Sequence, residues 1–295
     1  MFDLRYHVAS LAAVFIALII GILVGVGISD RGLVDKANRG LLEQRVQDLE
    51  TQLQNASQQS ATLKTEQQAA RTLINETYPV LIRNRLRGKN IAVVFIGSVD
   101  RSVRSAVSGA LTDAGAQQLR LRALKVPIDP AQLDAKLASQ PDADGYVGNA
   151  HLESLGKELG QELAKGGDTP LWNTLTDALV EERSGGNKQA ADGVIVVRTA
   201  QPQRGGTSRF LQGLYSGLAA AGVPAVGVER TDSPHPAITI YREAGLSTVD
   251  DVDKATGRLA LVFLLAGAPP GQYGQKPSAR DGALPPLETP TTAGG

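Results

Sequence analysis

The residue types that bind metals or carry out catalysis are scarce in this chain. Among its 295 residues there is no cysteine, and the only methionine is Met1. This composition excludes thiol nucleophiles, disulfides, iron–sulfur clusters and cysteine-ligated zinc. The three histidines, His7, His151 and His235, are far apart in the sequence. We therefore expect no resident cofactor, and we leave metal binding open with His151 and His235 as the candidates.

Both candidate histidines have a simpler structural interpretation. His151-Leu152-Glu153 resembles the H-x-E motif of zinc deaminases, but no cysteine follows to complete that metal site. The position instead favours a residue at the N-terminus of a helix. His235 lies between Pro234 and Pro236, which predicts an exposed and rigid surface turn.

An acidic group at Asp250, Asp251 and Asp253 resembles a calcium cluster. It lacks the spacing and the closing glutamate of an EF-hand. Because these residues precede a predicted helix, we interpret them as residues that cap its N-terminus.

No nucleotide-binding or hydrolase motif is complete. Gly97 follows an apolar run, as in a dinucleotide-binding loop, but the sequence there reads GSVDRS instead of G-x-G-x-x-G. This favours a plain turn between a strand and a helix. Residues 213–217 read GLYSG and come closest to G-x-S-x-G, but they lie inside a predicted helix. We predict that the protein is not an enzyme.

The charge balance narrows the choice of partners. The chain has 30 basic and 30 acidic residues, so its formal net charge is zero. Nucleic-acid-binding proteins normally carry a basic excess, and we expect no nucleic acid partner.

An apolar segment near the N-terminus predicts a membrane helix. Residues 8–28 carry no charge and would form a helix of roughly 31 Å, close to one hydrocarbon thickness. A signal-peptide core is about 7–15 residues, so we predict an uncleaved signal anchor within residues 1–29. Cleavage after the small-residue pattern at residues 25–27 is the alternative.

Small residues recur every four positions in this segment and place a packing stripe on one face. The stripe consists of Ala9, Ala13, Ala17, Gly21 and Gly25. More basic residues follow the span than precede it, so the positive-inside rule taken alone favours a cytoplasmic C-terminal side.

After a turn that contains Gly32 and Gly40, residues 41–82 predict a coiled-coil stalk. Its seam consists of Leu42, Val46, Leu49, Leu53, Leu63, Ile74 and Leu81. In a parallel homodimer, Arg45 would face Glu50 and Glu66 would face Arg71 of the other copy. A helix folded back on its own domain is the alternative.

Residues 88–268 alternate between strand and helix patterns, which predicts an α/β domain with a largely parallel sheet. Buried strands are expected at Ile91–Ile96 and Val194–Val197, and a more exposed strand at Gln118–Leu124. Shorter strands are predicted at residues 146–147, 225–228 and 238–240, and one helix at residues 170–183. Residues 269–295 are rich in Pro and Gly and predict a disordered tail.

Four segments carry a resemblance to a known family. They read FDLRYHVASLAAVF at residues 2–15, ALIIGILVG at residues 17–25, GRLALV at residues 257–262 and GQYG at residues 271–274. The chain resembles the mycobacterial copper transport protein B (MctB) family of actinobacteria. The resemblance implies a cell-envelope protein with one N-terminal span and its C-terminal domain outside the cytoplasm. It also implies a role in copper homeostasis through efflux or channel activity, with copper as the transported ion.

The residues themselves support a second hypothesis. A non-catalytic envelope scaffold would use the stalk to bind an exported coiled-coil protein, such as a cell-wall hydrolase or its regulator. Cu(I) prefers cysteine and methionine as ligands, and this chain contains neither apart from Met1.

Overall fold

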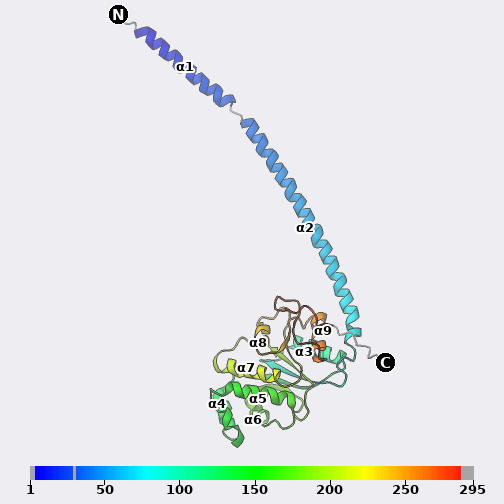
Figure 1. Cartoon of the computed structure of the whole chain (residues 1–295). Helices are drawn as coiled ribbons and strands as arrows, with labels where there is room; N and C mark the ends of the chain where they lie inside the picture. The colour runs from blue at the N-terminus through cyan, green and yellow to red at the C-terminus, as the bar shows by residue number, and fades with distance from the viewer. Residues whose placement is uncertain (1–3, 29–30, 287–295) are drawn as a thin grey trace. The chain divides into compact units, whose positions relative to one another are not determined.

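The computed structural model describes residues 4–28 and 31–286. It divides into two units, residues 1–70 and residues 71–295. The first unit contains α1 (Leu4–Ile28) and most of α2 (Arg31–Ile82), both drawn in blue in Figure 1. Residues 1–3 and 29–30 of the predicted anchor lie outside the described residues.

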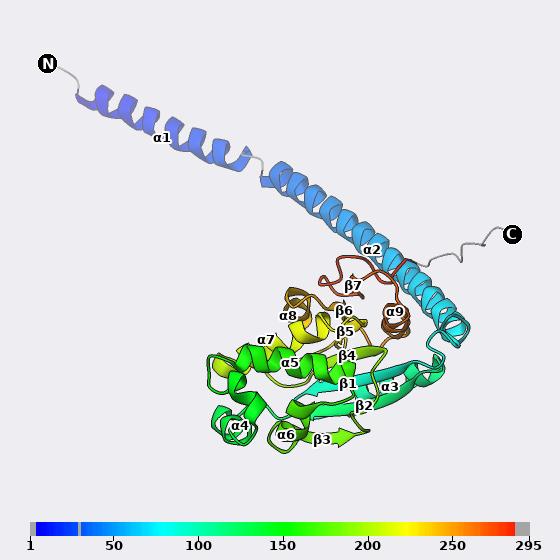
Figure 2. The same cartoon turned by 60° about the horizontal axis from the view of Figure 1, so that its bottom comes forward.

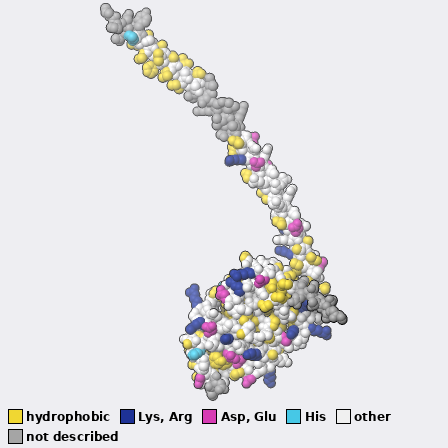
Figure 3. Space-filling model, viewed as in Figure 1, with side chains coloured by type: hydrophobic (Ala, Val, Ile, Leu, Met, Phe, Trp, Pro, Cys, Tyr) yellow, Lys and Arg dark blue, Asp and Glu magenta, His cyan; other side chains and the backbone are white. Residues whose placement is uncertain are grey.

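Helix α1 has the length and composition of a membrane span. Its segment His7–Gly25 has a mean hydropathy of 2.8 and is long enough to cross a bilayer. Hydrophobic side chains cover this helix in Figure 3. The prediction of one N-terminal apolar helix is confirmed.

Helix α2 contains the whole of the predicted stalk. It begins at Arg31 and continues through Gly40, so the turn expected before residue 41 is wrong. A long run of helix-forming residues on both sides keeps the glycines helical. Pro79 lies three residues before the helix ends at Ile82. Its ring removes one backbone hydrogen bond to the preceding turn, and the helix ends soon after it.

The second unit is built on one seven-stranded sheet with the order β3-β2-β1-β4-β5-β6-β7. All neighbouring strands are parallel except β2 and β3. The predicted α/β fold with a largely parallel sheet is confirmed. The strands are β1 (Asn90–Ile96), β2 (Gln117–Leu124), β3 (Val180–Ser184), β4 (Gly193–Arg198), β5 (Ala225–Val228), β6 (Ser247–Val249) and β7 (Gln272–Tyr273).

Helices cover both faces of the sheet (Figure 2). Alternate residues of β1 reach opposite cores: Val94 packs with α4 to α8, and Val93 packs with α3 and α9. The helices are α3 (Arg101–Asp113), α4 (Pro130–Leu137), α5 (Leu152–Lys165), α6 (Pro170–Leu179), α7 (Gly205–Ala219), α8 (Ile238–Glu243) and α9 (Ala255–Leu265), with a 3₁₀ turn at Pro141–Tyr146.

Helices α5 and α7 contact each other through glycines. Gly156 and Gly160 of α5 face the α7 backbone, while Gly213 and Gly217 of α7 face the α5 backbone. A Cβ atom at any of these positions would overlap a backbone atom of the opposite helix. The two backbones therefore approach as closely as small-residue helix pairs do elsewhere. The GLYSG sequence lies inside α7, as expected, and serves packing.

The last turns of α2 belong to the core of the second unit. Tyr78 and Ile82 are buried in the cluster that contains α3 and α9. The Arg258 guanidinium lies 5.3 Å from the centre of the Tyr78 ring. Leu81, a predicted seam residue, packs against the same cluster, and Ile74 is half-buried.

The predicted disordered tail begins too early. Residues 269–286 are placed against the second unit, and Gln272–Tyr273 adds β7 to the sheet beside β6. Although the segment has few apolar residues, hydrogen bonds to the buried Asp250 and Glu229 carboxylates hold it to the domain. The other predicted tail residues, 287–295, lie outside the described residues.

Three local predictions are wrong. Residues 238–240 begin α8, because Ile238 and Tyr241 are buried on one helix face. Residues 180–183, predicted to continue a helix, belong to β3 (Val180–Ser184), which pairs with β2. The predicted strand at residues 146–147 is the end of the 3₁₀ turn.

The strand predicted as more exposed, β2, is buried over its second half. Its polar residues Arg120 and Arg122 are 0% and 3% exposed. Arg120 Nη1 donates to Leu163 O at 2.7 Å, and Arg122 Nη1 donates to Ser184 O at 2.7 Å. Backbone carbonyls replace water around both guanidiniums, so the two arginines can be buried. For this reason the alternation of polar and apolar residues in β2 did not predict its exposure correctly.

We expect Gly217→Ala to destabilise the protein by about 1–3 kcal/mol, because the added methyl group would separate α5 from α7. Thermal unfolding of the full chain in detergent, followed by circular dichroism, measures the change. Gly109→Ala is the matched control at an exposed position of α3, where nothing lies within 4 Å of the added Cβ. It should stabilise by about 0.5–1 kcal/mol, and equal effects at both positions would contradict the close-contact argument.

Candidate functional site

The carboxyl ends of the parallel neighbours β1 and β4 lie side by side. Between these two strands, the direction in which successive strands are added to the sheet changes. From β1 the chain continues through α3 to β2, and from β4 it continues through α7 to β5 on the other side. Open α/β sheets usually bind ligands at such a switch point.

This edge is filled by the protein's own groups and offers no phosphate loop. The Asp100 carboxylate accepts hydrogen bonds from Ser102 N and Val103 N at the start of α3, at 2.8 and 3.0 Å. Thr199 Oγ1 donates to Ser98 O at 2.7 Å. A Cβ at Gly97 would lie 2.9 Å from Ala200 Cβ. An anion would meet a carboxylate and a closed loop there, which agrees with a plain turn.

The two candidate histidines lie on different elements. His151 is the exposed N-cap residue of α5, and its side chain makes no capping hydrogen bond. His235 lies in the loop before α8 and lines a small cleft of about 70 Å³ with Asp100, Glu229 and Arg230. The predicted loop position is confirmed, but the residue is half-buried and not exposed. Within residues 4–28 and 31–286, no three His, Cys, Asp or Glu side chains form a metal-binding group.

The acidic cluster does not cap α9, whose N-cap residue is Lys254. The Asp250 carboxylate accepts hydrogen bonds from Gln275 N at 2.9 Å and from Ser278 Oγ at 2.6 Å. Asp253 accepts from Thr231 N at 2.7 Å. These carboxylates organise loops at the carboxyl edge of the sheet, which the sequence pattern did not reveal.

An ion pair joins the C-terminal segment to the same edge. Glu229, at the end of β5, is 4% exposed and accepts a hydrogen bond from Ala237 N at 2.7 Å. Lys276 Nζ lies 2.7 Å from Glu229 Oε1 and also donates to Arg230 O. Gly274 has φ +141° and a Cβ there would collide with the Asp250 carboxylate. This explains why the GQYG segment needs its last glycine.

Asp251 is the buried acid whose titration is most altered. It is fully buried, and its Oδ1 makes no hydrogen bond to any described residue. Burial raises the pKa of Asp251 to about 6, against the lowering effect of the hydrogen bond from Thr256 Oγ1 at 2.8 Å. The neighbouring carboxylates of Asp250 and Asp253 raise this pKa further.

The predicted small-residue stripe and most of the predicted seam lie on exposed helix surfaces. Ala9, Ala13, Ala17, Gly21 and Gly25 are all exposed on α1. The apolar seam residues of α2 between Leu42 and Leu63 are 52–73% exposed. Exposed apolar side chains that form a contiguous patch often mark a surface that binds a partner. Pairing through either stripe remains a prediction.

A sequence model of the family described as "Copper transport outer membrane protein, MctB" matches residues 1–284. The chain belongs to this family. Two curated proteins named "Copper transporter MctB", from Mycobacterium bovis and Mycobacterium tuberculosis, are each 26% identical to it. Each alignment spans 315 positions and covers 93% of this chain and 96% of the relative. The MctB family match therefore includes both helices and the α/β domain.

Three charged residues at this edge, Arg198, Glu229 and Lys276, were not among the predicted site residues. Arg198 and Glu229 directly follow the apolar strand residues of β4 and β5, and a charged residue at that position is a usable signal. Lys276 had no local signal, because its partner is 47 residues away.

We expect Lys276→Met to destabilise the second unit by about 3 kcal/mol or more, because it leaves the buried Glu229 carboxylate without its counter-charge. Faster amide exchange at residues 269–286, measured by mass spectrometry, would accompany the loss. Lys254→Met removes the exposed pair with Asp253 and should cost less than about 1 kcal/mol. Unchanged exchange in Lys276→Met would contradict this role of the ion pair.

Asp251→Asn should alter how stability depends on pH. The folded-state pKa of Asp251 is raised. Its contribution to the free energy of unfolding is therefore present in full below about pH 4 and is lost as pH rises through about 6. Relative to the wild type, the variant should therefore gain up to about 3 kcal/mol between pH 4 and pH 7. Urea unfolding at several pH values measures this gain. Asp177→Asn, at an exposed position of α6, is the control that should leave the profile unchanged.

Proposed function

We propose that this protein is a membrane-anchored envelope protein that acts in copper homeostasis, through transport or efflux and not as an enzyme. The observation that carries the proposal is the match to the copper transport family over residues 1–284. The curated relatives named copper transporters cover nearly the same length. In this proposal α1 anchors the chain and the α/β domain lies outside the cytoplasm.

The described residues favour copper handling by an assembly. Cu(I) prefers cysteine and methionine ligands, and the chain has only Met1. One apolar helix also cannot enclose an aqueous path, since such a path needs several helices or a closed barrel. We therefore infer that copper passes through, or is delivered to, a complex of several chains.

The exposed stripe of α2 supports a parallel homodimer as the unit of that complex. Leu49 and Leu53 are 63% and 73% exposed and occupy successive d and a positions. In the same register Arg45 faces Glu50 of the second copy, and Glu66 faces Arg71. An exported coiled-coil protein would use the same stripe, but the family match favours the copper function over that scaffold.

The test measures the copper content of a deletion strain of the source organism. This strain is compared with the same strain carrying the wild-type gene, or a variant of it, on a plasmid. We expect the deletion strain to contain more copper than the wild type. Leu49→Asp/Leu53→Asp places two charges in the predicted seam and should abolish crosslinked dimers. Cells with this variant should therefore contain as much copper as the deletion strain. Gln47→Asp/Gln54→Asp adds the same charges outside the seam and should behave as the wild type.

Two outcomes would contradict the proposal separately. If the deletion strain and the complemented strain contain equal copper and grow equally in raised copper, the copper function is wrong. If the seam variant loses its crosslinks but keeps wild-type copper content, the function does not need the homodimer.

A further inference from the structure

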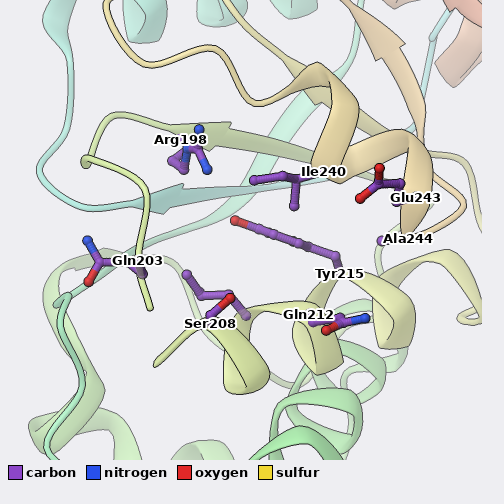
Figure 4. A pocket seen from close by; sticks show the side chains of 9 residues that line it. Arg198, Gln203, Ser208, Gln212, Tyr215, Ile240, Glu243 and Ala244 are labelled. Carbon is purple, nitrogen blue, oxygen red and sulfur yellow. The ribbon is translucent and has the colours of Figure 1, made fainter. Parts of the chain in front are cut away.

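A cavity of about 180 Å³ lies beside the carboxyl end of β4, between α7 and α8. Figure 4 shows the side chains that line it, with Arg198 on one side and Glu243 on the other. Tyr215 lies between them, and Gln203 and Ser208 lie below Arg198 in this view. The cavity is separate from the membrane helix and the exposed stripe of α2, and its function would be additional to copper handling.

Arg198 is a buried cation without an acidic partner among the described residues. It is 7% exposed, and none of the ion pairs in residues 4–28 and 31–286 includes it. Its Nη2 donates to Pro236 O at 2.6 Å and to His235 O at 3.4 Å, while its Nε has no hydrogen-bond partner there. Burying a guanidinium is costly unless a counter-charge or several acceptors replace water. Arg122 donates to three backbone carbonyls and to the Asn187 side chain, whereas Arg198 donates to two carbonyls. Arg120 also has two carbonyl acceptors, but it does not line the cavity.

Tyr215 adds a second donor without a partner. Its side chain is 1% exposed, and its hydroxyl makes no hydrogen bond to a described residue. Burial raises the pKa of Tyr215, so the hydroxyl stays protonated and can donate. The Tyr241 ring contacts it edge to face, with 5.3 Å between ring centres, and fixes its position. In Figure 4 the hydroxyl end of Tyr215 points toward the side where Arg198 lies.

We propose that this cavity binds a small organic monocarboxylate, with its carboxylate on Arg198 and Tyr215. A guanidinium matches the two oxygens of a carboxylate, and charge-assisted hydrogen bonds are stronger than neutral ones. Leu211 and Ile240 supply apolar surface for a short carbon chain. Glu243 on the opposite side disfavours a second negative charge, so dicarboxylates and phosphate fit less well.

The probes are lactate and isobutyrate, each compared with its uncharged amide, lactamide or isobutyramide. Calorimetric titration and thermal unfolding use the full chain in detergent. At least one acid should bind saturably and raise the unfolding temperature, and the amides should bind about 10-fold more weakly or not at all. The proposal is overturned if neither acid binds, if the amides bind equally well, or if phosphate binds and the acids do not.

Two variants locate the binding. Arg198→Gln should weaken acid binding by about 10-fold or more, whereas Arg209→Gln removes a charge from an exposed position of α7 and should have no effect. If Arg198→Gln does not fold, Ser208→Trp tests the same cavity, because it fills the exposed rim without removing a buried group. Acid binding at wild-type strength in whichever of these cavity variants folds would place the site elsewhere and overturn the proposal.

Discussion

The α/β domain depends on the backbone contact between α5 and α7. Because glycine occupies Gly156 and Gly160 on one helix and Gly213 and Gly217 on the other, the pair forms one thin layer on the sheet. The large residues of α7 then face the sheet and α8, where Tyr215 meets Tyr241. The wall of the Arg198 cavity is the outer edge of this same layer, so its shape follows from helix packing.

The buried charged side chains of the α/β domain are stabilised in different ways. Arg120 and Arg122 are surrounded by backbone carbonyls, and Glu229 has Lys276 as its counter-charge. A carbonyl shell or an ion pair keeps each of these groups solvated inside the protein. Arg198 has only the carbonyls before α8. Arg120 resembles Arg198 in having two carbonyl acceptors and an Nε without a partner among the described residues, but Arg198 also lines the cavity between α7 and α8, where a ligand can reach it.

Sequence patterns predicted the elements whose signals are local. The apolar runs of β1 and β4, the uncharged α1 and the heptads of α2 each follow from residues adjacent in the chain. Local sequence patterns could not predict the position of β7 in the sheet or the placement of residues 269–286. They depend on Asp250 and Glu229, which bond to residues 25 or more positions later. The Arg198 cavity likewise needs α7 and α8, and residues 238–240 resembled a strand.

The last turns of α2 limit where a second copy can pair. Tyr78 and Ile82 are buried in the domain core, and Leu81 packs against it. A seam that continued through Leu81 would have to remove apolar surface that the domain already covers, at a cost of about 25 cal/mol per Å². The exposed leucines from Leu42 to Leu63 carry no such cost. One helix can thus serve both contacts in succession, with the proposed dimer confined to the turns before Ala70, where the first unit ends.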